Sequence, residues 1–185
     1  MSSTIRPLHA VVRLRAVLAG LAAVLALLAV AAPAMAADRY VALGDSYSSG
    51  TGTRSYTLDS TCQRGIYAYP YLLAQARANT ALTFVACSGA TTTTLMNTQI
   101  SAVTSTTALV SVSIGGNDAG FSDVITECAK PALISDCAGK VTTAQNFIRN
   151  TLPGRLNTVY SAIKSRASAT VKVAVMGYPR IFNGE

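Results

Sequence analysis

The sequence contains little charge, a single histidine and no tryptophan. Only 12% of its 185 residues are charged and 50% are hydrophobic, which excludes a disordered chain and a charge-rich coiled coil. The 13 glycines follow no period of three, so a collagen triple helix is excluded. The basic residues from Arg39 to Arg180 form no cluster and accompany no Cys/His finger, which argues against nucleic acid as a partner. The length fits one ordinary domain.

Residues 1–36 differ from the rest of the chain and predict a secretory signal peptide. They contain 26 hydrophobic residues, three arginines and no acid, as read from the sequence. A basic stretch ends at Arg15, an apolar run covers 16–32, and Pro-Ala-Met-Ala over 33–36 is typical of a cleavage site. We therefore expect cleavage after Ala36 and a secreted protein without a stable membrane span. An uncleaved membrane anchor is the alternative, although the run is at the short limit for spanning.

All four cysteines follow this segment: Cys62, Cys87, Cys128 and Cys137. An even number in an oxidising compartment favours two disulfides over free thiols. Sequence alone permits three pairings, and we favour Cys62 with Cys87 and Cys128 with Cys137. A zinc site is the alternative, but no C-x-x-C pair is present and the only histidine, His9, lies in the signal. No metal and no cofactor are expected.

The chain after residue 36 alternates predicted strands with predicted helices. Segments rich in β-branched or aliphatic residues predict four buried strands, at 39–43, 82–86, 108–114 and 171–176. One helix is expected to open at Pro70, and another over 156–167 shows a single apolar face. Pro153-Gly154 is expected to separate the latter from an earlier helix. This order predicts a single α/β domain over 37–185, with a parallel sheet covered on both faces.

Three glycine-containing loops follow the first three predicted strands. They are Gly44-Asp45-Ser46-Tyr47-Ser48-Ser49-Gly50, Cys87-Ser88-Gly89-Ala90 and Gly115-Gly116-Asn117-Asp118. In a parallel sheet the carboxyl ends of the strands meet at one edge, where ligands normally bind. We therefore expect the three loops to converge there. Taken singly, each would pass as an ordinary turn or strand exit.

Each loop offers one part of an acyl-transfer site. Ser46 lies on a tight strand-to-helix turn, which is the position of a nucleophile. Gly89 has no Cβ, so its N–H can approach a substrate oxygen, and Asn117 can donate from its side-chain amide. The N–H groups of Ser46 and Gly89 and the Asn117 amide are predicted to form an oxyanion hole. Asp45 is expected to cap the following helix rather than act as a catalytic acid.

With these loops the sequence resembles the SGNH hydrolases, also called GDSL lipases and esterases, in particular the secreted bacterial lipase/phospholipase-like members. The resemblance rests on the motif 44–50, Gly89 and the motif 115–118, and it extends over essentially the whole chain after residue 36. Tyr47 replaces the commoner leucine. The resemblance implies a three-layer flavodoxin-like fold with sheet order 2-1-3-4-5, and it assigns Ser46 as nucleophile. It also implies an ester substrate, with lipids among the candidates, and a monomer at full length.

The fourth block of that family, Asp-x-x-His, is not found, and residues 37–185 contain no histidine. In the family this histidine removes the serine proton. The resemblance therefore implies that the fifth strand, the histidine loop and the final helix are missing, so we expect the domain 37–185 to be incomplete and this chain itself to be inactive. Lys164 and Lys172 are poor substitutes, because they are expected in a helix and a strand away from the loop edge.

The leading hypothesis is a secreted carboxylic-ester hydrolase of lipase or esterase type that forms an acyl-enzyme on Ser46. A catalytically inactive remnant or binding module of the same fold is the first alternative, because the histidine is missing. A membrane-tethered interaction protein is the second, and it depends only on the apolar run 16–32. The acyl and alcohol specificity is left open.

Overall fold

The computed structural model describes residues 37–179. The predicted signal peptide, residues 1–36, lies outside the described residues, as do residues 180–185. None of the helices in 37–179 is sufficiently long and apolar to cross a membrane.

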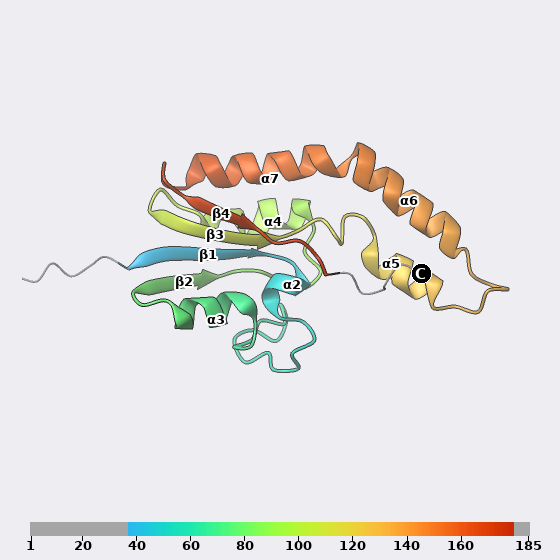
Figure 1. The fold of residues 1–185 in the computed structure, drawn as a ribbon, viewed down its shortest axis with the longest axis horizontal. Helices are drawn as coiled ribbons and strands as arrows, with labels where there is room; N and C mark the ends of the chain where they lie inside the picture. The colour runs from blue at the N-terminus through green and yellow to red at the C-terminus, as the bar shows by residue number, and fades with distance from the viewer. Residues whose placement is uncertain (1–36, 180–185) are drawn as a thin grey trace, which may run out of the picture. The chain divides into compact units, whose positions relative to one another are not determined.

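The described chain alternates strands and helices, as the sequence predicts (Figure 1). The strands are β1 (Asp38–Gly44), β2 (Thr80–Phe84), β3 (Thr107–Ser113) and β4 (Lys172–Val175). The helices are α2 (Ser46–Ser49), α3 (Tyr69–Ala76), α4 (Thr92–Thr98), α5 (Phe121–Cys128), α6 (Cys137–Asn150) and α7 (Leu152–Arg166), with a 3-10 turn at Ile100–Ala102. All strand pairs are parallel, in the order β2-β1-β3-β4. The prediction of a parallel α/β fold is confirmed.

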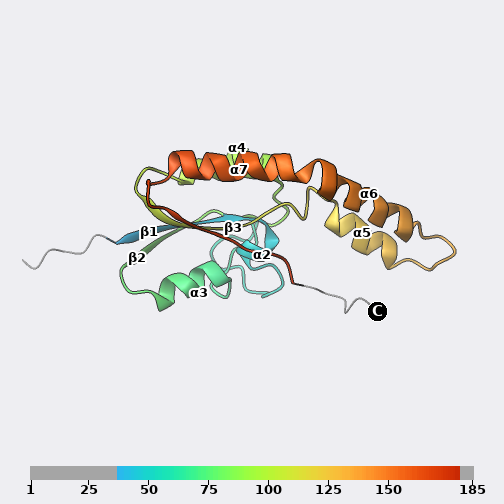
Figure 2. The ribbon, with the colours of Figure 1, turned by 45° about the horizontal axis from the view of Figure 1, so that its top comes forward.

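Helices cover both faces of the sheet and make a three-layer arrangement. Helix α3 lies on one face, and α4 and α7 lie on the other (Figure 2). Successive side chains of β1 alternate between the layers: Tyr40 packs with Ala74 of α3, whereas Val41 belongs to the larger core with Val159 and Ile163 of α7. The central strands β1 and β3 are buried over most of their length, whereas the edge strands β2 and β4 are partly exposed.

Two predicted boundaries were wrong. Strand β2 covers 80–84 rather than 82–86, because the N–H groups of Val85 and Ala86 both donate to the carbonyl of Ala42 and the chain leaves the ladder there. Helix α7 begins at Leu152, so Pro153 lies in its first turn instead of separating it from α6. Proline is tolerated at that place because the first N–H groups of a helix have no partner within the helix.

Both favoured cysteine pairs are present as disulfides. The Cys62–Cys87 bridge, with a sequence separation of 25, ties the loop after α2 to the segment after β2. The Cys128–Cys137 bridge, with a separation of 9, joins the end of α5 to the start of α6. The first bridge therefore ties the Gly89 loop to the segment that follows the Ser46 motif.

The two disulfides are expected to differ in their contribution to stability. Chain entropy predicts that replacing both cysteines of a pair by serine costs about 3.5 kcal/mol for Cys62/Cys87 and about 2.6 kcal/mol for Cys128/Cys137, since the first closes the longer loop. Urea unfolding of the two double variants, followed by circular dichroism, measures the difference. A larger loss for the Cys128/Cys137 variant would contradict this.

Candidate active site

Ser46 is the first residue of α2, directly after a sharp turn at the end of β1. Gly44 makes the turn with φ +129°, and a Cβ at this position would collide with the carbonyl oxygen of Ser113. Asp45 is the N-cap of α2, and its carboxylate accepts the N–H of Tyr47 at 3.1 Å. The predicted capping role of Asp45 is thus present. Ser46 is partly exposed and borders a cavity, so its hydroxyl is accessible.

A buried glutamine, which the sequence analysis did not identify, holds this turn in place. The Nε2 group of Gln99 donates to the carbonyl of Gly44 at 2.9 Å, and its Oε1 accepts the N–H of Gly44 at 2.8 Å. Gln99 is only 2% exposed and follows the last residue of α4. A polar residue at the end of a helix gives no sequence signal for a contact made 55 residues away.

The loop after β2 lies against the nucleophile turn. The N–H of Cys87 donates to the carbonyl of Gly44 at 3.0 Å. Gly89 has φ +80°, a left-handed conformation that glycine adopts without strain, and the space beside its Cα is open. The left-handed backbone is thus a second reason for glycine at position 89. The first, expected from the sequence, is that its N–H can approach a substrate oxygen closely.

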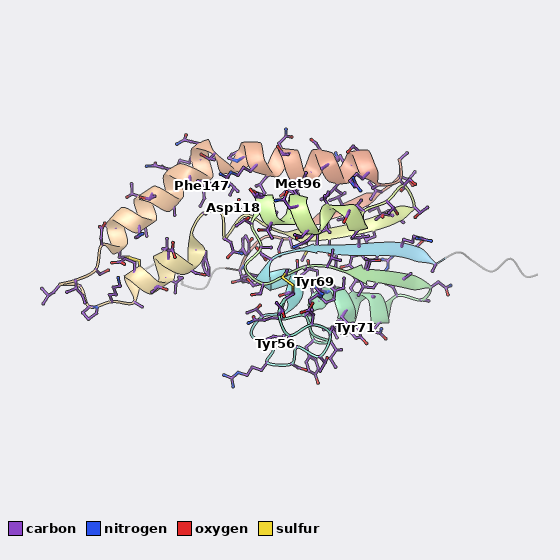
Figure 3. All side chains as sticks on the ribbon, turned by 180° about the vertical axis from the view of Figure 1, so that it is seen from behind. Tyr56, Tyr69, Tyr71, Met96, Asp118 and Phe147 are labelled. Carbon is purple, nitrogen blue, oxygen red and sulfur yellow. A yellow bond between two sulfur atoms is a disulfide. The ribbon has the colours of Figure 1, made fainter. Side chains whose placement is uncertain are left out.

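Asn117 connects the third loop to the second. Its Nδ2 donates to the carbonyl of Ala90 at 2.9 Å, which leaves the other amide hydrogen for a ligand. The neighbouring Asp118, labelled in Figure 3, has a side chain that is 0% exposed, and it anchors the loop. Asp118 accepts from the N–H of Thr92 at 2.8 Å and from Arg155 at 3.1 Å, so the loop is fastened to α4 and α7.

A second residue that the sequence analysis did not assign, Tyr178, joins the first loop to the third. Its hydroxyl donates to the carboxylate of Asp45 and accepts the N–H of Gly116 at 3.0 Å. Its ring packs edge-on against Tyr47, with ring centroids 5.0 Å apart. Because Asp45 precedes Ser46 and Gly116 precedes Asn117, this one hydroxyl sets the spacing of two proposed catalytic groups.

The surroundings of the hydrogen bond between Tyr178 and Asp45 determine which of the two groups carries the proton. Burial raises the pKa of Asp45 above its usual value, against the hydrogen bonds from Tyr178 and Ser113, which lower it. Burial, and then the contact with Asp45, raise the pKa of Tyr178. The phenol therefore keeps its proton at neutral pH and acts as a donor.

A cavity of about 470 Å³ opens beside Ser46 and Asn117. Its wall is mainly apolar and comes from α5, α6, α7 and the segment after β4. The side chains are Phe121, Val124, Ala144, Ile148, Leu152, Leu156, Tyr160, Val175 and Met176. The sequence did not predict this cavity. The apolar face expected on the last helix is divided: Val159 and Ile163 are buried in the core, whereas Leu156 and Tyr160 reach the cavity.

The described residues offer Ser46 no evident base. They contain no histidine, and Lys172 begins β4, at the edge of the sheet opposite to the nucleophile turn. Lys164 lies in the last turn of α7. The structure thus brings together the three predicted loops and leaves both lysines away from them.

Comparisons with known proteins agree with this arrangement. The profile of the GDSL-like Lipase/Acylhydrolase family matches residues 42–184. Lipase 1 of Streptomyces coelicolor is 48% identical over 165 residues, which cover 89% of this chain and 61% of the relative. The crystal structure of an extracellular lipase from Streptomyces rimosus superimposes with a TM-score of 0.73 at 44% identity, over 80% of this chain and 62% of that one. Phospholipase A1 from Streptomyces albidoflavus gives a TM-score of 0.73 at 47% identity, with the same coverage.

The chain spans about six tenths of the length of the curated relatives it matches, 61% of the S. coelicolor lipase and 57% of the S. rimosus lipase.

Proposed function

Because this chain belongs to the GDSL-like lipase/acylhydrolase family, we propose that it provides the nucleophile and oxyanion hole of a secreted carboxylic-ester hydrolase. The observation that carries the proposal is the convergence of three loops, two of which border an apolar cavity, with Ser46 at the start of a helix. A helix start presents free N–H groups, which suit an oxyanion that develops beside the nucleophile.

In the proposed reaction, Ser46 Oγ attacks the carbonyl carbon of the ester and loses its proton to a base. The N–H groups of Ser46 and Gly89 and the Nδ2 of Asn117 hold the resulting oxyanion. Collapse of the intermediate breaks the bond to the alcohol, which takes the proton and leaves an acyl group on Ser46. Water then releases the acid by the same steps. Since residues 37–185 contain no histidine, we assign the base to sequence outside them.

Trapping the acyl-enzyme tests this proposal. After a brief incubation with an activated ester, mass spectrometry of the chain extended by a carboxyl-terminal segment with the Asp-x-x-His block should find the acyl group on the peptide that contains Ser46. The Ser46→Ala variant should carry none, whereas Ser60→Ala, at an exposed serine outside the site, should be acylated normally. Acylation of lysines alone, equal in all three proteins, would count against a nucleophilic Ser46.

For the substrate we propose esters of long-chain fatty acids. The cavity falls within the usual range of about 300 to 1,000 Å³ for ligand pockets, and its apolar wall suits an acyl chain rather than a sugar. Support also comes from the names of the relatives, two of which are a lipase and a phospholipase A1.

Filling the cavity should weaken the binding of acyl chains. Ala144 lies on the cavity wall, and Ala144→Phe is expected to weaken the binding of a fluorescent C16 fatty acid at least about tenfold, because the ring occupies the space that the chain would fill. Ala138→Phe, at an exposed position of the same helix, is the matched control and should bind normally. Equal affinities for the two variants would place the acyl chain elsewhere.

A non-catalytic binding module is the second candidate, and the lack of histidine in residues 37–185 favours it. Such a module would bind the fatty acid and never acylate Ser46. The trapping experiment therefore separates the candidates.

We also propose that residues 1–36 are removed on export. The two disulfides suit an oxidising compartment, and one relative is described as an extracellular lipase. Amino-terminal sequencing of protein from the culture medium should begin at Ala37. Secreted material that retains the apolar run would contradict cleavage.

A further inference from the structure

We propose that the loop between α5 and α6, residues 129–136, is a lipid-binding tip that holds the protein at a lipid–water interface. Its four consecutive apolar residues, Pro131 to Ile134, are all exposed. Leu133 is 99% exposed and Ile134 is 71% exposed, the two highest values among the large hydrophobic residues that the structure describes. A run of exposed apolar residues is unfavourable in water, so in a folded protein it indicates a contact surface. The choice of lipid as the partner rests on the proposed function.

The tip is braced. The second disulfide closes the loop at its base. Glu127, near the end of α5, then holds both sides of the loop: its carbonyl accepts from Ser135 Oγ at 2.7 Å, and its carboxylate accepts from the N–H of Asp136 at 2.9 Å and from Lys130 Nζ at 2.6 Å. A braced loop loses little conformational entropy when it binds, so the apolar side chains are presented in a form ready for burial.

Charge and size favour a zwitterionic lipid surface as the partner. The ionisable side chains of the loop and its base are Glu127, Lys130, Asp136 and Lys140, so the net charge is zero. A surface without net charge gains little from an anionic polymer or anionic lipid, and apolar burial remains the driving force. A tip of four residues is also too small for a stable protein interface, which needs roughly 1,000 Å².

The tip is well placed to deliver substrate. Helices α5 and α6 lie side by side and run from the tip back toward the sheet (Figures 1 and 2). Phe121 and Val124 of α5 and Ile148 of α6 line the acyl cavity. An eight-residue helix is about 12 Å long, less than half the thickness of the hydrocarbon core of a bilayer, about 30 Å. Anchoring the tip therefore brings the cavity within reach of a lipid ester.

Vesicle binding tests the inference on the exported chain that begins at Ala37, so that the apolar run 16–32 does not contribute to binding. The vesicles consist of phosphatidylcholine with ether-linked chains, which contains no ester that Ser46 could hydrolyse. The double variant Leu133→Ser/Ile134→Ser is expected to partition about a hundredfold less than the unsubstituted chain. The matched control, Leu72→Ser/Leu73→Ser, removes an exposed apolar pair from α3 and should stay within about twofold.

The absence of tryptophan allows a second, site-specific measurement. In Leu133→Trp the new indole is the only one in the chain, and its emission should shift to the blue and be quenched by brominated ether lipids. In Leu72→Trp neither change is expected. Because both positions are exposed, urea unfolding should confirm that these variants are as stable as the unsubstituted chain.

Several results would overturn the inference. One is a lack of vesicle binding by the unsubstituted chain, and another is an equal loss in both double variants. A loss of binding beyond about twofold when NaCl rises from about 0.1 to about 0.5 M would show that charge drives it. Self-association that disappears in Leu133→Ser/Ile134→Ser would make a second copy the partner. Ser46→Ala should bind vesicles normally, so failure of the ester chemistry is distinguishable from failure of the tip.

Discussion

The 185-residue chain should hydrolyse a p-nitrophenyl ester at least about 10⁴-fold more slowly than the same chain extended by a relative's carboxyl-terminal segment that carries the Asp-x-x-His block. The physical reason is that Ser46 is a neutral alcohol without a base, and the region 37–185 contains no histidine. The proposed oxyanion hole would still stabilise charge in the transition state, but that alone yields a rate close to the background of the assay. Initial rates for the two proteins at neutral pH measure the difference.

Two controls accompany this comparison. Ser46→Ala in the extended chain should return the rate to that of the shorter one, and changing the added histidine to alanine should do the same. If the shorter chain instead turned over ester rapidly and Ser46→Ala stopped it, the proposal of an external base would be wrong. A lysine would then have to be considered as the base.

Asn117→Ala in the extended chain is expected to lower kcat about 10²- to 10³-fold with little change in KM. The amide acts on the charge that develops in the transition state, so its loss affects turnover more than binding. The same substitution removes the hydrogen bond to the carbonyl of Ala90, which should cost about 1 kcal/mol of stability. Steady-state kinetics and urea unfolding measure the two effects separately.

The matched control is Asn97→Ala, at an exposed asparagine on α4. It should change neither kcat nor stability appreciably. If Asn117→Ala raised KM with kcat unchanged, Asn117 would bind the substrate in its ground state, and the proposed oxyanion role would fail.

The three loops of the candidate site were predictable because each lies in a local pattern. A glycine-containing loop after an apolar run identifies the exit of a strand, and parallel strands place their exits at one edge. Ser46, Gly89 and Asn117 could therefore be selected from the sequence, and the structure brings their loops together. The Cys62–Cys87 pair was also favoured, and the structure contains it.

The contacts that hold these loops were not predictable. Gln99 bonds to Gly44 across 55 residues, and Tyr178 reaches Asp45 across 133. Neither residue shows a periodicity that would reveal its contact, and a buried glutamine or a tyrosine after a strand occurs for many reasons. The acyl cavity was missed for a related cause, since its wall combines three helices with the segment after β4.

The sequence by itself determined the order of the four strands and of helices α3, α6 and α7, the loops with catalytic residue types and the lack of histidine after residue 36. The strands, helices and loops follow from hydrophobic periodicity and turn-forming residues, which involve only a few neighbouring residues. The lack of histidine is read directly from the composition. Only the tertiary structure decided how the loops are spaced, where α7 begins and that Leu133 and Ile134 are exposed to water. Such features depend on which groups far apart in the sequence pack together. A hydrogen bond or a buried face needs two partners, and the residues around one partner do not indicate where the other lies.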